Sequence, residues 1–253
     1  MQLKRHIPNI ITLLNLFCGC IAVIFAVHDN LILAALFVAL GIGFDFFDGF
    51  AARMLNVQSE LGLQLDSLAD MVTSGLVPGI VMFQLLSKVS GDSVNTVFNS
   101  WDFNQNMDSI DIPYIALIGL LITLASAYRL AKFNIDTRQT TSFIGLPTPA
   151  NTLLIISLPL ILEFQQQAWV SNIILNMWFL IGITLVSCYL LNAEIHLFAL
   201  KFKTWRFTGN TVRYLFLLLT IVLIALLKFM AIPCVILLYV LMSFIFKEKT
   251  VSV

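Results

Sequence analysis

Four aspartates stand within the most apolar part of this 253-residue chain. They belong to one spaced pattern, which reads Asp45-x2-Asp48-Gly49-x2-Ala52-Arg53-x8-Gly62-x3-Asp66-x3-Asp70. The residues before the pattern (31–44) are almost wholly apolar, and those after it (71–86) nearly so. Carboxylates within apolar spans are costly and rare, and they usually serve a function. Four of them cannot all stay ionised together unless cations share the site.

The spacing predicts two facing pairs of carboxylates. Asp45 and Asp48 are three residues apart, and Asp66 and Asp70 are four apart, so each pair shares one face of a helix. The polar segment 54–60 is short, which makes the two helices antiparallel neighbours with each pair about 10 Å from the turn. We therefore expect all four carboxylates at about one depth. The alternative is that the four residues are unrelated aspartates at helix ends exposed to solvent. Such aspartates would have no reason to form two pairs on facing sides of neighbouring helices.

Clustered carboxylate oxygens are hard ligands, and they favour Mg²⁺, Mn²⁺ or Ca²⁺ over metals that prefer thiolates. The pattern thus predicts a divalent-metal site, and we expect two ions of Mg²⁺ or Mn²⁺.

The composition places this site in a membrane protein. Hydrophobic residues make up 59% of the chain and charged residues 11%, and the mean hydropathy is +0.95. We expect an all-α polytopic membrane protein with one integral membrane domain over 1–253, a catalytic core at about 7–190 and a C-terminal helix pair at about 212–246. The eight expected spans are 10–27, 31–50, 65–86, 113–133, 150–162, 169–190, 212–227 and 232–246. The net charge is zero, and no nucleic-acid partner is expected.

The distribution of basic residues predicts the orientation. With the N-terminus in the cytoplasm, only Lys88 and Lys228 fall outside. The cytoplasmic set is Lys4, Arg5, Arg53, Arg129, Lys132, Arg138, Lys201, Lys203, Arg206, Arg213, Lys247 and Lys249. We therefore expect a protein of the cytoplasmic (inner) membrane, with the aspartates opening to the cytoplasm and the polar loop 88–112 outside.

The aspartate pattern resembles the signature of the CDP-alcohol phosphatidyltransferases, D-x2-D-G-x2-A-R-x8-G-x3-D-x3-D, and all eight fixed positions match. The resemblance implies a metal-dependent enzyme that moves a phosphatidyl group from CDP-diacylglycerol to an alcohol and releases CMP. It also implies a homodimer. Asp45, Asp48, Asp66 and Asp70 would hold metal, and Asp70 would also be the general base.

A second set of residues is predicted to bind CDP-diacylglycerol. The set is Asn9, Thr12, Gly49, Ala52, Arg53, Ser59 and Gly62. The guanidinium of Arg53 can bind a phosphate, or it can serve only as a topology charge. Ser59 can be only a helix N-cap, and Ala52 and Gly62 can serve only close helix packing. The segment around Asn9 and Thr12 resembles the family's opening, although Pro8-Asn9 also reads as a helix start and Thr12 as a buried hydroxyl.

Two further segments, 129–134 and 143–150, resemble parts of the bacterial-type membrane phosphatidylserine synthases. Arg129, Lys132, Asn134 and Thr148 are the candidate acceptor-binding residues. Lys132 stands where these enzymes usually have Arg, so its contact with an anionic group would be looser. Arg129 and Lys132 can instead be topology charges that touch lipid head groups.

These observations predict transfer of the phosphatidyl group to L-serine, which gives phosphatidylserine and CMP. The partners would be CDP-diacylglycerol, L-serine and the lipid bilayer. One alternative is another acceptor, such as glycerol 3-phosphate or inositol phosphate. A different class, a cation-coupled transporter, would place carboxylates near mid-bilayer within broken inverted repeats, and neither feature is evident.

Overall fold

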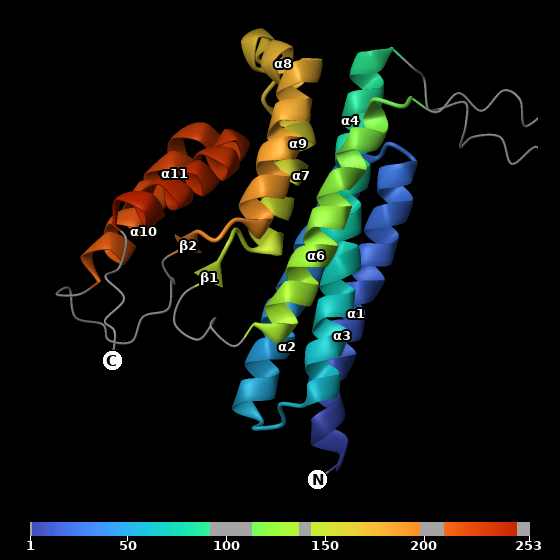
Figure 1. Ribbon diagram of the computed structural model, residues 1–253, viewed down its shortest axis with the longest axis vertical. Coiled ribbons are helices and arrows are strands. Elements are labelled where there is room, and N and C mark those ends of the chain that lie inside the picture. The colour runs from blue at the N-terminus through green and yellow to red at the C-terminus, as the bar shows by residue number, and fades with distance from the viewer. Residues whose placement is uncertain (1, 92–112, 137–142, 198–209, 247–253) are drawn as a thin grey trace, which may run out of the picture.

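The computed structural model describes residues 2–91, 113–136, 143–197 and 210–246, which are almost entirely helical (Figure 1). The first half contains α1 (Gln2–Val27), α2 (Leu31–Met54), α3 (Glu60–Asp70), the π-helix η1 (Met71–Leu76), α4 (Val77–Ser90), the 3-10 helix η3 (Ala116–Leu120) and α6 (Leu121–Ile135). The second half contains β1 (Phe143–Ile144), α7 (Thr148–Phe164), α8 (Ala168–Ile174), α9 (Met177–Asn192), β2 (His196–Leu197), α10 (Thr211–Leu227), the 3-10 helix η4 (Lys228–Met230) and α11 (Ala231–Ile245). The all-α prediction is confirmed.

The apolar surfaces of the helices fit a membrane. Buried side chains such as Ala22, Val81 and Ile155 form the main core between the helices. Large apolar side chains such as Phe17 and Leu124 are more than half exposed, and this outward surface suits contact with lipid. The structure therefore confirms the class of integral membrane protein that the composition predicts.

The predicted count of eight spans is not confirmed. Among the described residues, five helical segments are long and apolar enough to cross a membrane, or six if α8 and α9, bent by 61°, form one span. One of the five, Thr211–Ile245, contains both α10 and α11. The rings of Phe216 and Tyr239 pack 5.7 Å apart, although they are 23 residues apart in sequence, so this segment folds back at Lys228 as a helical hairpin. Helix α7, with 17 residues, is shorter than a usual span.

Small residues let three helices meet beside the aspartates. A Cβ atom added at Gly41 of α2 would lie 2.7 Å from Thr73 Cγ2 and 2.8 Å from Asn15 Oδ1. An added Cβ at Gly19 of α1 would also overlap the Thr73 side chain. Thr73 Oγ1 donates to the Asn15 carbonyl at 3.2 Å, so η1 is held against α1 at this point. Glycine is required here for close approach.

The helix that carries Asp70 changes its winding directly after this residue. The sequence predicts an uninterrupted span over 65–86, but η1 is a π-helix, a feature that is frequent at functional sites. Two backbone carbonyls of η1 accept hydrogen bonds from other helices. Thr152 Oγ1 donates to the Ser74 carbonyl at 2.8 Å, and Thr123 Oγ1 donates to the Gly75 carbonyl at 3.1 Å. Residues of α6 and α7 thus complete the local structure beside Asp70.

A small strand pair fixes the start of α7. β1 pairs antiparallel with β2, and the Gly145 N–H donates to the Ile195 carbonyl at 2.9 Å. Gly145 has a φ of 75°, and an added Cβ would lie 2.6 Å from the Leu191 carbonyl oxygen, so only glycine fits. The segment 143–150 is therefore anchored to the end of α9.

Candidate functional site

Three of the four aspartates come together between α2 and α3. Oxygen atoms of Asp45, Asp48 and Asp66 all lie within 4.8 Å of one another. Opposite ligands of one ion are about 4.2 Å apart at Mg²⁺ bond lengths and about 4.8 Å apart at Ca²⁺ bond lengths. Asp48 is buried, and the other two are partly exposed. The donor set is all carboxylate oxygen, so these residues fit a hard divalent cation.

Asp70 is not part of this group of three, although its charge interacts with those of Asp45, Asp48 and Asp66. Its Oδ1 lies 3.5 Å from Asn15 Nδ2, which is a long contact rather than a strong hydrogen bond. Asp70 is nevertheless close enough to Asp66 and Arg129 to interact with their charges. Its charge thus interacts both with the carboxylate cluster and with a buried cation.

A cavity of about 340 Å³ opens next to the carboxylates. Its walls include every residue predicted to bind CDP-diacylglycerol, together with Asp48 and Asp66. Gly49 keeps one wall open, because only the Arg53 guanidinium, 3.9 Å away, lies near the position of an added Cβ. The structure therefore brings α1, α2 and the start of α3 around one space that adjoins the predicted metal ligands.

The local contacts decide some of the alternative interpretations. Ser59 is an N-cap, since its Oγ accepts from the Gly62 N–H at 3.1 Å, and it also lines the cavity. The interpretation of Pro8 as a helix start is wrong, because α1 begins at Gln2 and carries Pro8 inside it. Thr12 is indeed a buried hydroxyl, but it donates to Asp48 Oδ2 at 2.5 Å. Thr12 therefore orients a predicted metal ligand as well as lining the cavity.

The predicted acceptor-binding residues lie on α6 and at the start of α7, and their surroundings differ. Arg129 is 7% exposed, and its Nη2 donates to the Gly145 carbonyl at 3.4 Å. Asn134 accepts from Ser67 Oγ at 3.0 Å, next to Asp66 in α3. Thr148 is buried at the start of α7. Lys132 Nζ lies 3.7 Å from Glu194, so this lysine has an acidic partner within the protein.

Sequence reasoning missed several residues of the site. Asn15 is fully buried and contacts Asp70, and it follows Thr12 by three residues on the same face of α1. That spacing was a usable signal. Val57, Gln58 and Leu63 also line the cavity, but no chemical signature distinguishes them in the sequence.

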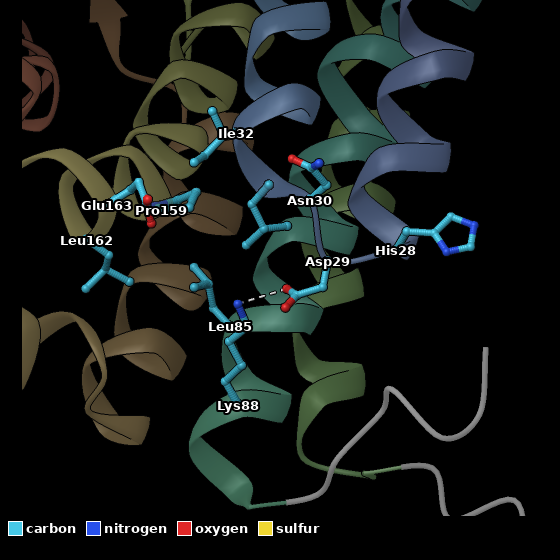
Figure 2. Close-up of a pocket in the computed structure, with 10 residues that line it drawn as sticks. His28, Asp29, Asn30, Ile32, Leu85, Lys88, Pro159, Leu162 and Glu163 are labelled. Atoms are coloured by element: carbon cyan, nitrogen blue, oxygen red, sulfur yellow. Dashed lines mark ion pairs between the residues drawn. The ribbon is translucent and has the colours of Figure 1, made fainter. Parts of the chain in front are cut away.

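A second cavity, of about 550 Å³, lies at the opposite end of the helices (Figure 2). Lys88 Nζ and Asp29 Oδ1 form an ion pair of 2.9 Å at its edge, and Glu163 of α7 also lines it. Here Asp29 already has a cationic partner. The cavity is larger than the one beside the aspartates, but the described residues place no carboxylate cluster there.

Comparison with known protein families agrees with this geometry. The family model described as CDP-alcohol phosphatidyltransferase matches residues 5–190, which is well over half of the chain. This range includes α1 to α6, the carboxylate cluster and the adjoining cavity.

Three similar proteins from different bacteria share one name. The CDP-diacylglycerol–serine O-phosphatidyltransferase of Bacillus subtilis is 33% identical over 146 residues, which are 57% of this chain and 70% of that protein. The protein of the same name from Helicobacter pylori is 27% identical over 185 residues, or 71% of this chain and 69% of that protein. The one from Mycobacterium tuberculosis is 29% identical over 181 residues, or 68% and 55%.

Proposed function

Because this chain belongs to the CDP-alcohol phosphatidyltransferase family, we propose that it transfers a phosphatidyl group from CDP-diacylglycerol to the hydroxyl of L-serine, releasing CMP. The observation that carries this proposal is the cluster of three carboxylates, with oxygens within 4.8 Å of one another, at the edge of a cavity that α1, α2 and α3 enclose. The choice of serine is supported by the names of the relatives and by the buried Arg129 beside Asp70.

The residues of the site divide into three groups by role. The first group would hold two ions of Mg²⁺ or Mn²⁺, and it consists of Asp45, Asp48 and Asp66, together with Asp70 by family resemblance. When bound, these cations would neutralise the donor pyrophosphate and stabilise the leaving CMP oxygen. Arg53 binds a donor phosphate through its planar guanidinium. Asp70 accepts the proton of the acceptor hydroxyl, and the Asn15 amide helps to orient it.

We also propose that the protein lies in the cytoplasmic membrane as a homodimer, with the site facing the cytoplasm and residues 7–190 as its catalytic core. The positions of the described basic residues support the orientation. Arg53 and Lys132 lie at the end of the helices that holds the site, whereas Lys88 lies at the cavity of the opposite end. Several of the other basic residues used for the orientation lie outside the described residues, and so does most of the loop 88–112.

Cysteine labelling tests this orientation. In a variant without the four native cysteines, Ser90→Cys should react in intact cells with a thiol reagent that cannot cross membranes. Asn56→Cys, in the exposed α2–α3 turn, should react only after the cells are opened. The opposite pattern of labelling would reverse the proposed orientation.

An acceptor panel tests the proposed substrate. With CDP-diacylglycerol and Mg²⁺ or Mn²⁺, the purified protein should use L-serine in preference to glycerol 3-phosphate or inositol phosphate. Arg129→Ala should raise the KM for serine by about tenfold or more and change the KM for the lipid donor little, because the lost guanidinium is a buried charged donor. Lys132→Ala should have the smaller effect, because Lys132 is near Glu194. Faster turnover with glycerol 3-phosphate would assign the chain to another acceptor within the family.

A further inference from the structure

A layer of buried polar side chains lies beside Asp70, on elements that do not line the 340 Å³ cavity. It consists of Ser74 of η1, Ser126 and Arg129 of α6, and Asn151 of α7. Arg129 is 7% exposed, and the other three side chains are fully buried. We call these four side chains the polar layer.

The contacts between the three elements make the polar layer one place in the fold. An added Cβ at Gly75 would lie 3.3 Å from Ser126 Cβ, so Ser126 packs against η1 directly beside Ser74. Thr152, the neighbour of Asn151 in α7, donates to the Ser74 carbonyl at 2.8 Å. Arg129 lies one helical turn from Ser126 and interacts with the charge of Asp70.

Polar atoms of every member lack a partner within the described part of the chain. These atoms are Ser74 Oγ, Ser126 Oγ, Arg129 Nε, and Asn151 Oδ1 and Nδ2. Buried side-chain polar groups are normally hydrogen-bonded, and an unpaired one is strongly unfavourable. Other unpaired buried hydroxyls, such as those of Ser87 and Thr220, lie on other helices. Five unpaired atoms on three elements that meet next to Asp70 indicate a ligand that completes them.

The unpaired atoms need a ligand that supplies both hydrogen-bond donors and acceptors, and the ammonium and carboxylate of an amino acid supply both. Asn151 Oδ1 can only accept, whereas Asn151 Nδ2 and Arg129 Nε can only donate, and the two serine hydroxyls can do either. An ammonium group satisfies the amide oxygen, and a carboxylate satisfies the amide nitrogen and the guanidinium. A phosphorylated alcohol could donate to Asn151 Oδ1 only through a neutral hydroxyl, and its phosphate would meet a single cation within the layer.

Resting on the proposed function, we propose that the polar layer binds the ammonium and carboxylate groups of the acceptor amino acid, with Asn151 selecting for the ammonium. The position of Asp70 beside the layer then brings it to the hydroxyl of the bound acceptor. Because the layer is closed to solvent in this structure, the acceptor can reach it only through a local opening of the helices.

The test compares L-serine with two truncated acceptors. 3-Hydroxypropionate lacks the ammonium of serine, and ethanolamine lacks the carboxylate. Asn151→Leu should lower kcat/KM for serine about 10- to 100-fold more than kcat/KM for 3-hydroxypropionate, because only serine also loses the bond from its ammonium, and this is the range of one hydrogen bond to a charged group. The KM for CDP-diacylglycerol should not move. Ser157→Ala is the matched control, because Ser157 is a buried residue of α7 whose hydroxyl already bonds to the Leu154 carbonyl at 2.7 Å.

An isosteric variant keeps the test decisive if leucine disturbs folding. Asn151→Asp retains an acceptor for the ammonium but repels the carboxylate, so it should shift preference from serine towards ethanolamine. An unchanged ratio of serine to 3-hydroxypropionate in Asn151→Leu, together with an unchanged ratio of serine to ethanolamine in Asn151→Asp, would overturn the assignment of Asn151. An equal loss for all three acceptors would do the same. Wild-type protein that does not prefer serine at all would instead refute the proposed function.

Discussion

Asparagine in place of Asp45, Asp48 or Asp66 is expected to lower phosphatidyl transfer at least about 100-fold. Each carboxylate supplies an oxygen to a cluster whose members lie within 4.8 Å of one another, so each substitution would remove a charged ligand from the proposed metal centre. Metal ions contribute several kcal/mol of charge stabilisation in such reactions, and each 1.4 kcal/mol corresponds to about tenfold in rate.

The same substitutions should affect stability in the opposite direction when metal is absent. At an effective dielectric constant of about 20, two like charges at this separation repel by about 3 kcal/mol. Removing one carboxylate should therefore leave the melting temperature in chelator unchanged or raised. The stabilisation that Mg²⁺ or Mn²⁺ gives the wild type, about 2.7 kcal/mol at 100 times the Kd, should be lost.

Thermal unfolding in detergent with and without the cation measures both effects. Asp29→Asn is the matched control, because Asp29 is paired with Lys88 at the opposite end of the helices. This control should keep both its turnover and its stabilisation by metal. If Asp48→Asn retained full turnover and full stabilisation by the cation, the three carboxylates would not be a metal centre.

Asp70→Asn is expected to cut turnover by about 10² to 10⁴, the range typical for loss of a general base. Asp70 lies outside the group of three carboxylates and next to Arg129, so the affinity for CDP-diacylglycerol should stay largely intact. Stabilisation by the metal should also persist, at least in part. Single-turnover kinetics and donor binding, measured on the same preparation, distinguish the two roles of this residue.

A different pattern would make Asp70 mainly a metal ligand. In that case the variant would lose donor affinity and metal stabilisation while retaining turnover at saturating donor. The family resemblance assigns Asp70 both roles, and these measurements decide which of the two dominates in this chain.

The carboxylate cluster was predictable because its geometry is local. Spacings of three and four residues place carboxylates on one helix face, and the short turn between α2 and α3 makes the two faces meet. The family resemblance predicted that Gly49, Ser59 and Gly62 bind the same ligand, and all three residues line one cavity. In this part of the chain, sequence distance and spatial distance nearly coincide.

The surroundings of Asp70 were not predictable, because they are formed by contacts between residues that are far apart in the sequence. A π-helix at Met71–Leu76 depends on Thr123 and Thr152, which donate from other helices. The strand pair joins Ile144 to His196 across about fifty residues. No periodicity in the apolar sequence distinguishes such a segment from an ordinary span. The predicted count of eight spans was not confirmed for a related reason, since helices of 15 to 17 residues fit both a short span and a half-buried hairpin.

The most direct test of the account is the product balance of the purified protein in detergent with CDP-diacylglycerol, L-serine and Mg²⁺ or Mn²⁺. The reaction should give equal amounts of CMP and phosphatidylserine. A chelator should abolish product formation, and restoring the cation should restore it. Formation of phosphatidylserine at the full rate in metal-free buffer, or no phosphatidylserine with both substrates and the cation present, would contradict the account.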